Sequence, residues 1–81
     1  MSEEWRPLSA LPTGQVGVVR RLAGGRGFMG RLAALGFTPG VEVTMVQNFG
    51  HGPLIVLVRD TRVALGRGEA AKVLVGRMTH E

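Results

Sequence analysis

Arginine is the residue type through which this sequence could do chemistry. The chain holds ten Lys and Arg residues, nine of them Arg, against six Asp and Glu residues, for a net charge of +4. Glu3, Glu4 and Glu81 lie at the ends, so residues 5–79 carry ten basic and three acidic side chains, or +7. Arginine pairs with carboxylates and phosphates through two parallel hydrogen bonds. This segment is therefore either an ordinary solvated surface or a face for an anionic partner: an acidic protein, lipid headgroups or nucleic acid.

The sequence offers little for catalysis. It has no Cys, no Tyr and two His, and its serines, Ser2 and Ser9, both lie near the N-terminus. Nucleophile–base constellations and thiolate metal sites therefore lack their usual residues. A G-x-x-x-x-G-K-[ST] loop is also missing, so nucleotide binding of the P-loop kind is not expected. We expect a protein that is not an enzyme, with no catalytic residue and no cofactor.

Metal binding has few candidate ligands. They are His51, His80, Asp60, Glu42 and Glu69. No two of them have a ligand spacing such as H-x₃-H, and a ferrous site would need folding or a second molecule to gather two or three. We therefore predict no metal site.

One segment, residues 24–40, has a helical period, GGRGFMGRLAALGFTPG. At about 100° per residue, one arc of the helix collects apolar side chains and the opposite arc collects small ones with a single charge. The first arc is expected to be buried and consists of Phe28, Met29, Leu32, Leu35 and Gly36. The second is expected to be exposed and consists of Gly27, Gly30, Arg31 and Ala34.

The end of this helix can be read from local rules. Gly36 fits the first position beyond the helix, where a left-handed backbone costs glycine little, and Phe37 and Leu32 then form the apolar contact of a Schellman motif. Residues 38–41, TPGV, predict a type II turn. At the other end, Gly24-Gly25-Arg26-Gly27 is either a flexible lead-in or an anion site. Arg26 opposes the helix dipole there, which would make sense if it serves a partner.

The remaining pattern predicts about five short strands: residues 15–22, 41–45, 54–58, 62–65 and 72–76, with a helical turn in 66–71 before the last. Leu8 and Leu11 are the first residues expected in the core, and residues 1–7 are expected to be loosely ordered. Trp5 is expected to lie across the surface or to contact a partner. Strands this short predict one small barrel domain spanning residues 1–81, an all-β fold with one inserted helix.

The strand at residues 54–58, LIVLV, is apolar on both faces. Leu54, Val56 and Val58 should face the core, which leaves Ile55 and Leu57 on the other side. These two are either covered by the N-terminal segment or the helix, or form an exposed patch of the kind that usually marks a partner site.

Several runs resemble the ferrous-iron transport protein A family. They are RLAALGFTPGVEV at residues 31–43, GPLIVLVR at 52–59, Ala64-Leu65, Glu69-Ala70 and Val73, with Leu8, Leu11, Gly14 and Val18 resembling the family's opening. The resemblance implies an SH3-like barrel with the helix after the first strand. It also implies a small cytosolic accessory to the ferrous-iron permease, a membrane protein with a cytoplasmic GTPase domain. The family often has Gly where this chain has Asp60-Thr61, so the turn type there is open.

These observations converge on an interaction module. We expect an acidic surface of the permease's cytoplasmic part to contact a set of basic, small and apolar residues: Arg26, Gly30, Arg31, Ala34, Ile55, Leu57, Arg59 and Arg62. Weak self-association through Ile55 and Leu57 is a further possibility. A cytoplasmic location is expected, since no apolar run reaches membrane length and MSEEWRP is acidic where a signal peptide is basic.

Two alternatives stay open. The same barrel is similar to the C-terminal domain of iron-dependent repressors, so a regulatory module of such a system is one. A basic small barrel that binds nucleic acid is the other. Against the second, the chain has four aromatic residues, and two of them, Phe28 and Phe37, are assigned to the core, which leaves little for base stacking. Affinity for nucleic acid would also fall steeply with salt.

Overall fold

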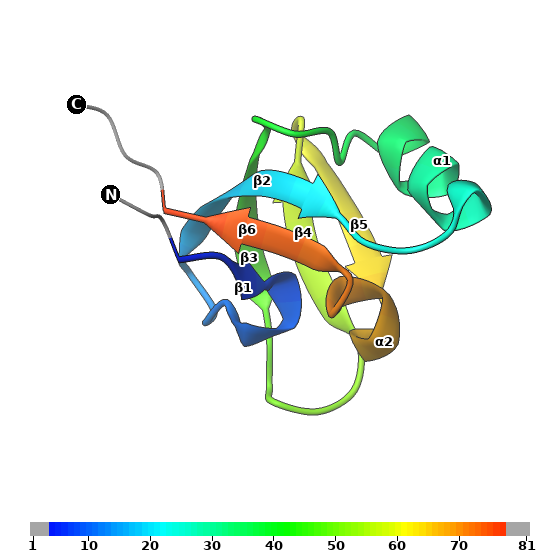
Figure 1. The fold of residues 1–81 in the computed structure, drawn as a ribbon. Helices are drawn as coiled ribbons and strands as arrows, with labels where there is room; N and C mark the ends of the chain where they lie inside the picture. Colours follow the sequence, from blue (N-terminus) through cyan, green and yellow to red (C-terminus); the bar gives the residue numbers. More distant parts are fainter. Residues whose placement is uncertain (1–3, 78–81) are drawn as a thin grey trace.

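The computed structural model describes residues 4–77, which form a six-stranded antiparallel sheet bent into a small barrel (Figure 1). The sheet order is β1-β6-β2-β3-β4-β5. In chain order the elements are β1 (Arg6–Pro7), the 3-10 helix η1 (Leu8–Ala10), β2 (Val16–Leu22), α1 (Arg26–Ala34), β3 (Glu42–Gln47), β4 (Leu54–Val58), β5 (Thr61–Leu65), α2 (Arg67–Ala70) and β6 (Val73–Gly76). The predicted all-β barrel with one inserted helix is confirmed. The sixth strand is β1, whose two residues pair with β6.

The barrel interior is filled by side chains that alternate along the strands. In β4, Leu54, Val56 and Val58 are at most 1% exposed, as the alternation predicts. Val56 lies between Met45 of β3 and Val63 of β5 in the register. Leu8 and Leu11 close one side of the core, also as predicted. This core contains no buried polar or charged side chain among the described residues.

The β2 strand departs from simple alternation. Strict alternation would put Arg21 on the same face as Val19, which is in the core. Arg21 is exposed instead, because the register shifts between Val19 and Arg21. Gly17 faces Val75 so closely that a Cβ on it would lie 3.2 Å from the Val75 Cβ. That position is the close backbone approach for which glycine is suited.

The helix end and the turn after it form as predicted. Gly36 has φ +105°, the Phe37 N–H donates to the Leu32 carbonyl at 3.0 Å, and the Gly36 N–H donates to the Ala33 carbonyl at 3.0 Å. These are the two hydrogen bonds of a Schellman motif. The turn closes with the Val41 N–H on the Thr38 carbonyl, and Gly40 supplies φ +95°.

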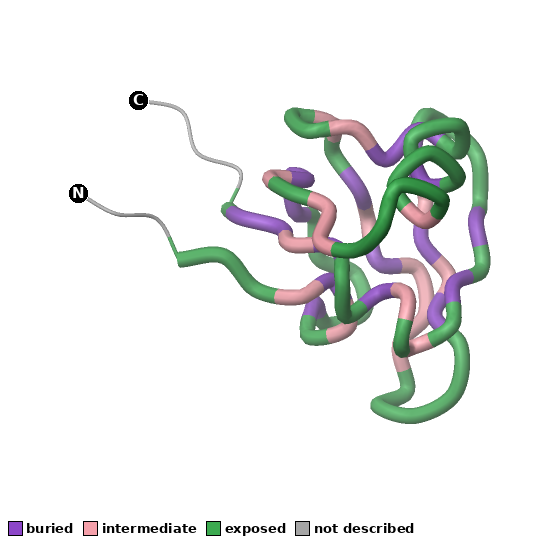
Figure 2. Tube along the Cα trace, turned by 45° about the vertical axis from the view of Figure 1, so that its right-hand side comes forward, coloured by how far each residue is buried: buried purple, intermediate pink, exposed green. Residues whose placement is uncertain are grey.

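The burial expected for α1 is wrong at two positions. Leu32 is fully buried and Phe28 is half-buried, but Met29 and Leu35 are 40% and 41% exposed. The reason is the position of the helix, which lies to one side of the barrel (Figure 1), so that Leu32 is buried in the core and Phe28 packs against it, while the other side chains of α1 stay exposed. Figure 2 shows α1 almost wholly in the exposed class, in contrast to the alternating strands.

Candidate docking surface

The α1 helix presents most of its circumference to solvent. Arg26, Gly30, Arg31 and Ala34, the predicted partner residues on the helix, are all exposed. At about 100° per residue, Gly30 and Ala34 lie near the middle of the exposed arc, opposite Leu32. We give the name α1 surface to six of the exposed residues of α1 and its C-cap: Arg26, Met29, Gly30, Arg31, Ala34 and Leu35.

Met29 and Leu35 are the members that sequence reasoning missed. Their place in the apolar arc predicts burial, yet they lie at the two borders of that arc and face solvent. A partner seated over the small residues Gly30 and Ala34 would touch one or both of these large side chains. The width of the apolar arc could have signalled this, because a helix that buries a single side chain leaves the borders of the arc exposed.

An ion pair connects α1 to α2. The Arg31 guanidinium lies 2.6 Å from the Glu69 carboxylate, with the two side chains 55% and 33% exposed. Glu69 also accepts a hydrogen bond from the Gly66 N–H at 3.1 Å, which satisfies a backbone donor at the start of α2. The hydrogen bond from Arg31, followed by that from the Gly66 N–H, holds the pKa of Glu69 below its ordinary value. Arg31 therefore has a structural partner while half of its side chain stays accessible.

Phe28 packs beneath this connection. Its ring lies 5.9 Å from the Arg31 guanidinium carbon and 5.3 Å from the Lys72 nitrogen, both measured to the ring centroid. Cations placed over an aromatic face are attracted to it, more weakly where water has access. Phe28 thus contacts two cations and also packs against the hydrophobic core.

The predicted partner residues outside α1 belong to a second surface. Leu57 pairs with Arg62, and Ile55 with Ala64, across β4 and β5. Ile55 and Leu57 are half-buried, and Arg62 is exposed. These residues face outward from the sheet, so folding does not merge them with the α1 surface.

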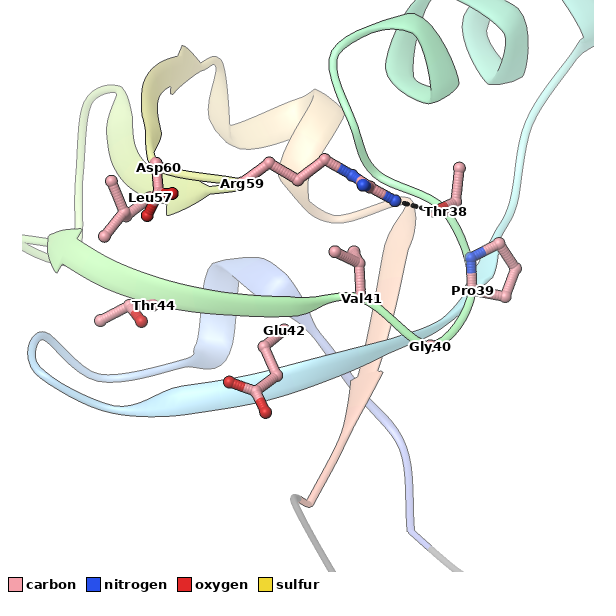
Figure 3. A pocket seen from close by; sticks show the side chains of 9 residues that line it. All are labelled: Thr38, Pro39, Gly40, Val41, Glu42, Thr44, Leu57, Arg59 and Asp60. Carbon is pink, nitrogen blue, oxygen red and sulfur yellow. Dashed lines mark hydrogen bonds between the residues drawn. The ribbon is translucent and has the colours of Figure 1, made fainter.

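Arg59 lies between the two surfaces. Its Nη2 is 3.4 Å from the Thr38 hydroxyl, and its side chain would be 3.0 Å from a Cβ on Gly36. Arg59 and Leu57 also line a groove of about 650 Å³ beside the start of β3 (Figure 3). The lining residues are Thr38, Pro39, Gly40, Val41, Glu42, Thr44, Leu57, Arg59 and Asp60.

Candidate metal ligands are not gathered by the fold. Within residues 4–77, no three His, Asp or Glu side chains could hold an ion together. Glu69 is taken by Arg31, and His51 is exposed on the loop between β3 and β4. His80 lies outside the described residues. In the Gly24–Gly27 segment Arg26 is exposed, but no other feature of these residues indicates an anion site.

The loop between β3 and β4 is anchored by Asn48, a residue that sequence reasoning passed over. Its side-chain nitrogen donates to the carbonyls of Ser9 and Leu11 at 3.1 and 2.9 Å, and its side-chain oxygen accepts from Arg67 of α2. The neighbouring Phe49 is 68% exposed. Trp5, the other exposed aromatic, is 46% exposed. An Asn in a glycine-rich loop was the available signal, but its long-range partners could not be read from the sequence.

No helix in the described part of the chain has the length and apolar character needed to cross a membrane. The small barrel, with the helix inserted between β2 and β3, defines an SH3-like domain. The chain belongs to the FeoA family, since the model of the FeoA domain matches residues 6–77.

Individual relatives agree with this assignment. A protein of Methanocaldococcus jannaschii named as a candidate Fe(2+) transport protein A is 32% identical over 69 residues, covering 85% of this chain and 83% of that protein. The crystal structure of an iron uptake regulatory protein, FeoA, superposes with a TM-score of 0.85 at 33% identity, covering 90% and 97% of the two chains. A zinc-bound FeoA of Stenotrophomonas maltophilia, described as an SH3 domain protein, gives 0.76 at 40% identity, covering 84% and 86%.

The fold is shared more widely. A manganese-dependent transcriptional repressor superposes with a TM-score of 0.85 at 21% identity. This chain matches 44% of the length of that repressor, so the likeness concerns the fold of one part of it.

Proposed function

We propose that this protein is a non-catalytic accessory of ferrous-iron uptake in the cytoplasm, and that it docks through the α1 surface on the cytoplasmic part of a ferrous-iron permease with its GTPase domain. The observation that carries the proposal is the exposure of Met29 and Leu35, at 40% and 41%, on a helix that also presents Arg26 and Arg31. Large apolar side chains beside arginines are the composition expected of a binding site rather than of a free surface.

The chemistry of the partner follows from this surface. Gly30 and Ala34 allow close approach of another backbone, because neither carries a side chain larger than a methyl group. Arg26 forms no ion pair with the described residues, and the accessible half of Arg31 adds positive charge. An acidic patch with an apolar centre would complement this arrangement, because guanidinium groups pair with carboxylates in defined geometry.

The direct test follows the amide signals of the isotope-labelled protein while the permease's cytoplasmic GTPase domain is added, with and without nucleotide. We expect shifts concentrated on residues 26–35. If the shifts depend on nucleotide, the protein acts in the GTPase cycle. An absence of shifts at high concentration of the domain would remove it as the direct partner.

A substitution locates the contact. Gly30→Glu places a bulky carboxylate at the centre of the α1 surface, where a Cβ meets nothing within 4 Å, so the fold should survive. We expect binding to weaken by about tenfold or more, because a like charge now faces an acidic partner. The matched control is Gly68→Glu in α2, which also has open space at its Cβ and should bind normally. If Gly30→Glu unfolds the protein, Gly30 is structural and the assignment is wrong.

One alternative function is favoured by a specific observation. The likeness of the fold to a metal-dependent repressor supports a regulatory module that acts on such a protein instead of the permease. The same amide titration carried out with a repressor of this type separates the two. Shifts on residues 26–35 with the repressor and none with the GTPase domain would favour the alternative.

A further inference from the structure

The short helix α2 lies between α1 and the β3–β4 loop (Figure 1). Ala70 is its one buried residue. Its two charged side chains contact different neighbours: Glu69 pairs with Arg31 of α1 at 2.6 Å, and Arg67 donates to acceptors in the β3–β4 loop. The α2 helix is therefore a direct bridge between two largely exposed elements that are separate in the sequence.

Arg67 supports the β3–β4 loop at two points. It donates to the Gly52 carbonyl at 3.0 Å and to the side-chain oxygen of Asn48, which also accepts from the Gly50 N–H at 3.0 Å. These contacts lie on both sides of Phe49, the large and exposed side chain of the loop. The segment that presents Phe49 to solvent is thus held in part by α2.

Glu69 has two roles that its two carboxylate oxygens divide between them. Its Oε2 pairs with Arg31, while its Oε1 accepts from the Gly66 N–H at 3.1 Å at the start of α2. Gly66, the N-cap residue, brings no capping side chain of its own. A helix of four residues has little stability by itself, so it depends on contacts of this kind. Any change that moves Glu69 therefore acts on the first turn of α2, where Arg67 also lies.

We propose that α2 couples the α1 surface to the β3–β4 loop, so that a partner that takes Arg31 away from Glu69 loosens the segment around Phe49. More than half of the Arg31 side chain is exposed, so an acidic partner can reach it. Glu69 then loses the cation that holds it, α2 is less firmly fixed, and Arg67 holds Asn48 less tightly. This regulatory use rests on the docking proposed above, whereas the coupling itself is a property of the free protein.

The side-chain NH₂ group of Asn48 reports the state of the loop. Its nitrogen donates to the carbonyls of Ser9 and Leu11 at 3.1 and 2.9 Å, so its hydrogens should exchange slowly with solvent while the loop is ordered. Arg31→Gln in the isotope-labelled full chain removes the cation from Glu69 without touching the loop. We expect exchange of the Asn48 group to become about twofold to threefold faster, which is the effect of losing a partly exposed ion pair.

Two variants are matched controls for Arg31→Gln. Arg26→Gln removes the same charge from α1, at a side chain that forms no ion pair with the described residues. Arg31→Lys keeps a cation beside Glu69. Both controls should leave the exchange of the Asn48 group close to that of the wild type.

Coupling is reciprocal, so a change at the loop must also reach α1. Arg67→Gln weakens the contacts of α2 with Asn48 and Gly52 and leaves every residue of α1 in place. We expect the backbone amides of residues 29–34 to exchange about twofold faster in this variant. The Met29 N–H, which donates to the Gly25 carbonyl at 2.9 Å, reports the first turn of the helix.

The coupling is overturned by wild-type exchange of the Asn48 group in Arg31→Gln, by an equal increase in Arg26→Gln, or by unchanged α1 amides in Arg67→Gln. Adding the permease's GTPase domain to the wild type then tests the regulatory use, because exchange of the Asn48 group should rise together with the shifts on residues 26–35. Shifts on α1 with no change at Asn48 would overturn the regulatory use and leave the docking intact. An absence of shifts on α1 would overturn the docking, while the variants of the free protein would still decide the coupling.

Discussion

The α1 helix and the β4 strand are both rich in apolar side chains, yet the fold uses them differently. Three of the five residues of β4 are at most 1% exposed, with neighbours in register on both sides. Of the nine residues of α1, only Leu32 is buried. The helix is otherwise held by the half-buried Phe28, by Arg31 on Glu69 and by its Schellman end, where Arg59 packs on Gly36. The barrel therefore carries the stability of the domain, and α1 carries surface that remains available to a partner.

The largest effect should come from truncating one leucine in each region. Leu54→Ala in β4 removes a fully buried side chain from the core. We expect a loss of about 3 kcal/mol in the free energy of unfolding, measured with urea. Leu35→Ala at the end of α1 should change that free energy by less than about 0.5 kcal/mol, because its side chain is 41% exposed. Equal losses would mean that α1 is part of the core.

Substitutions of two glycines, one within α1 and one just after it, test how tightly each position is packed. Gly36 has φ +105°, and a Cβ there would be 3.0 Å from Arg59 Cδ, so Gly36→Ala should cost about 1–2 kcal/mol. Gly30 has open space at its Cβ, and Gly30→Ala should gain about 0.5–1 kcal/mol from helix propensity. Thermal melts should show a lower melting temperature for Gly36→Ala and a higher one for Gly30→Ala than for the wild type. A destabilised Gly30→Ala variant would contradict the exposure of the middle of the helix.

The smallest effect concerns the Arg31–Glu69 ion pair. The pKa of Glu69 is lowered in the folded protein, mainly by Arg31, so the pair adds stability at neutral pH. That contribution should be present above the ordinary glutamate pKa, about 4.3, and should be lost as the pH falls through the lower folded value. The melting temperatures of the wild type and Glu69→Gln should therefore differ at pH 7 and converge at low pH. A difference that persists after Glu69 is protonated would show that the pair is not its source.

Local rules predict the parts of the fold that depend on neighbours in the sequence. Gly36, Phe37 and the TPGV turn lie within a few residues of one another, so the Schellman motif and the turn follow from residue types and spacing alone. The alternation in β4 predicts its inward residues for the same reason. The two-residue strand β1 escapes such rules because two residues carry no period.

The candidate sites were harder to predict because they depend on where elements meet. Met29 and Leu35 satisfy the helical pattern of a buried face, and only the position of α1 beside the barrel leaves them exposed. The groove needs residues 38–44 and 57–60, which the β3–β4 register brings together from separate parts of the chain. The contact of Arg59 with Thr38 is equally a property of the folded protein. No spacing in the sequence encodes these arrangements.

Hydrogen exchange of the backbone amides, with and without the permease's cytoplasmic GTPase domain, tests the central claim most directly. The claim is that α1 is a lightly held helix that a partner completes. It predicts that the α1 amides exchange through local opening, at least about 100-fold faster than those of β4. It also predicts that the domain slows exchange in α1 while β4 is unchanged. Exchange of α1 at the rate of β4 in the free protein, with no added protection by the domain, would contradict the claim.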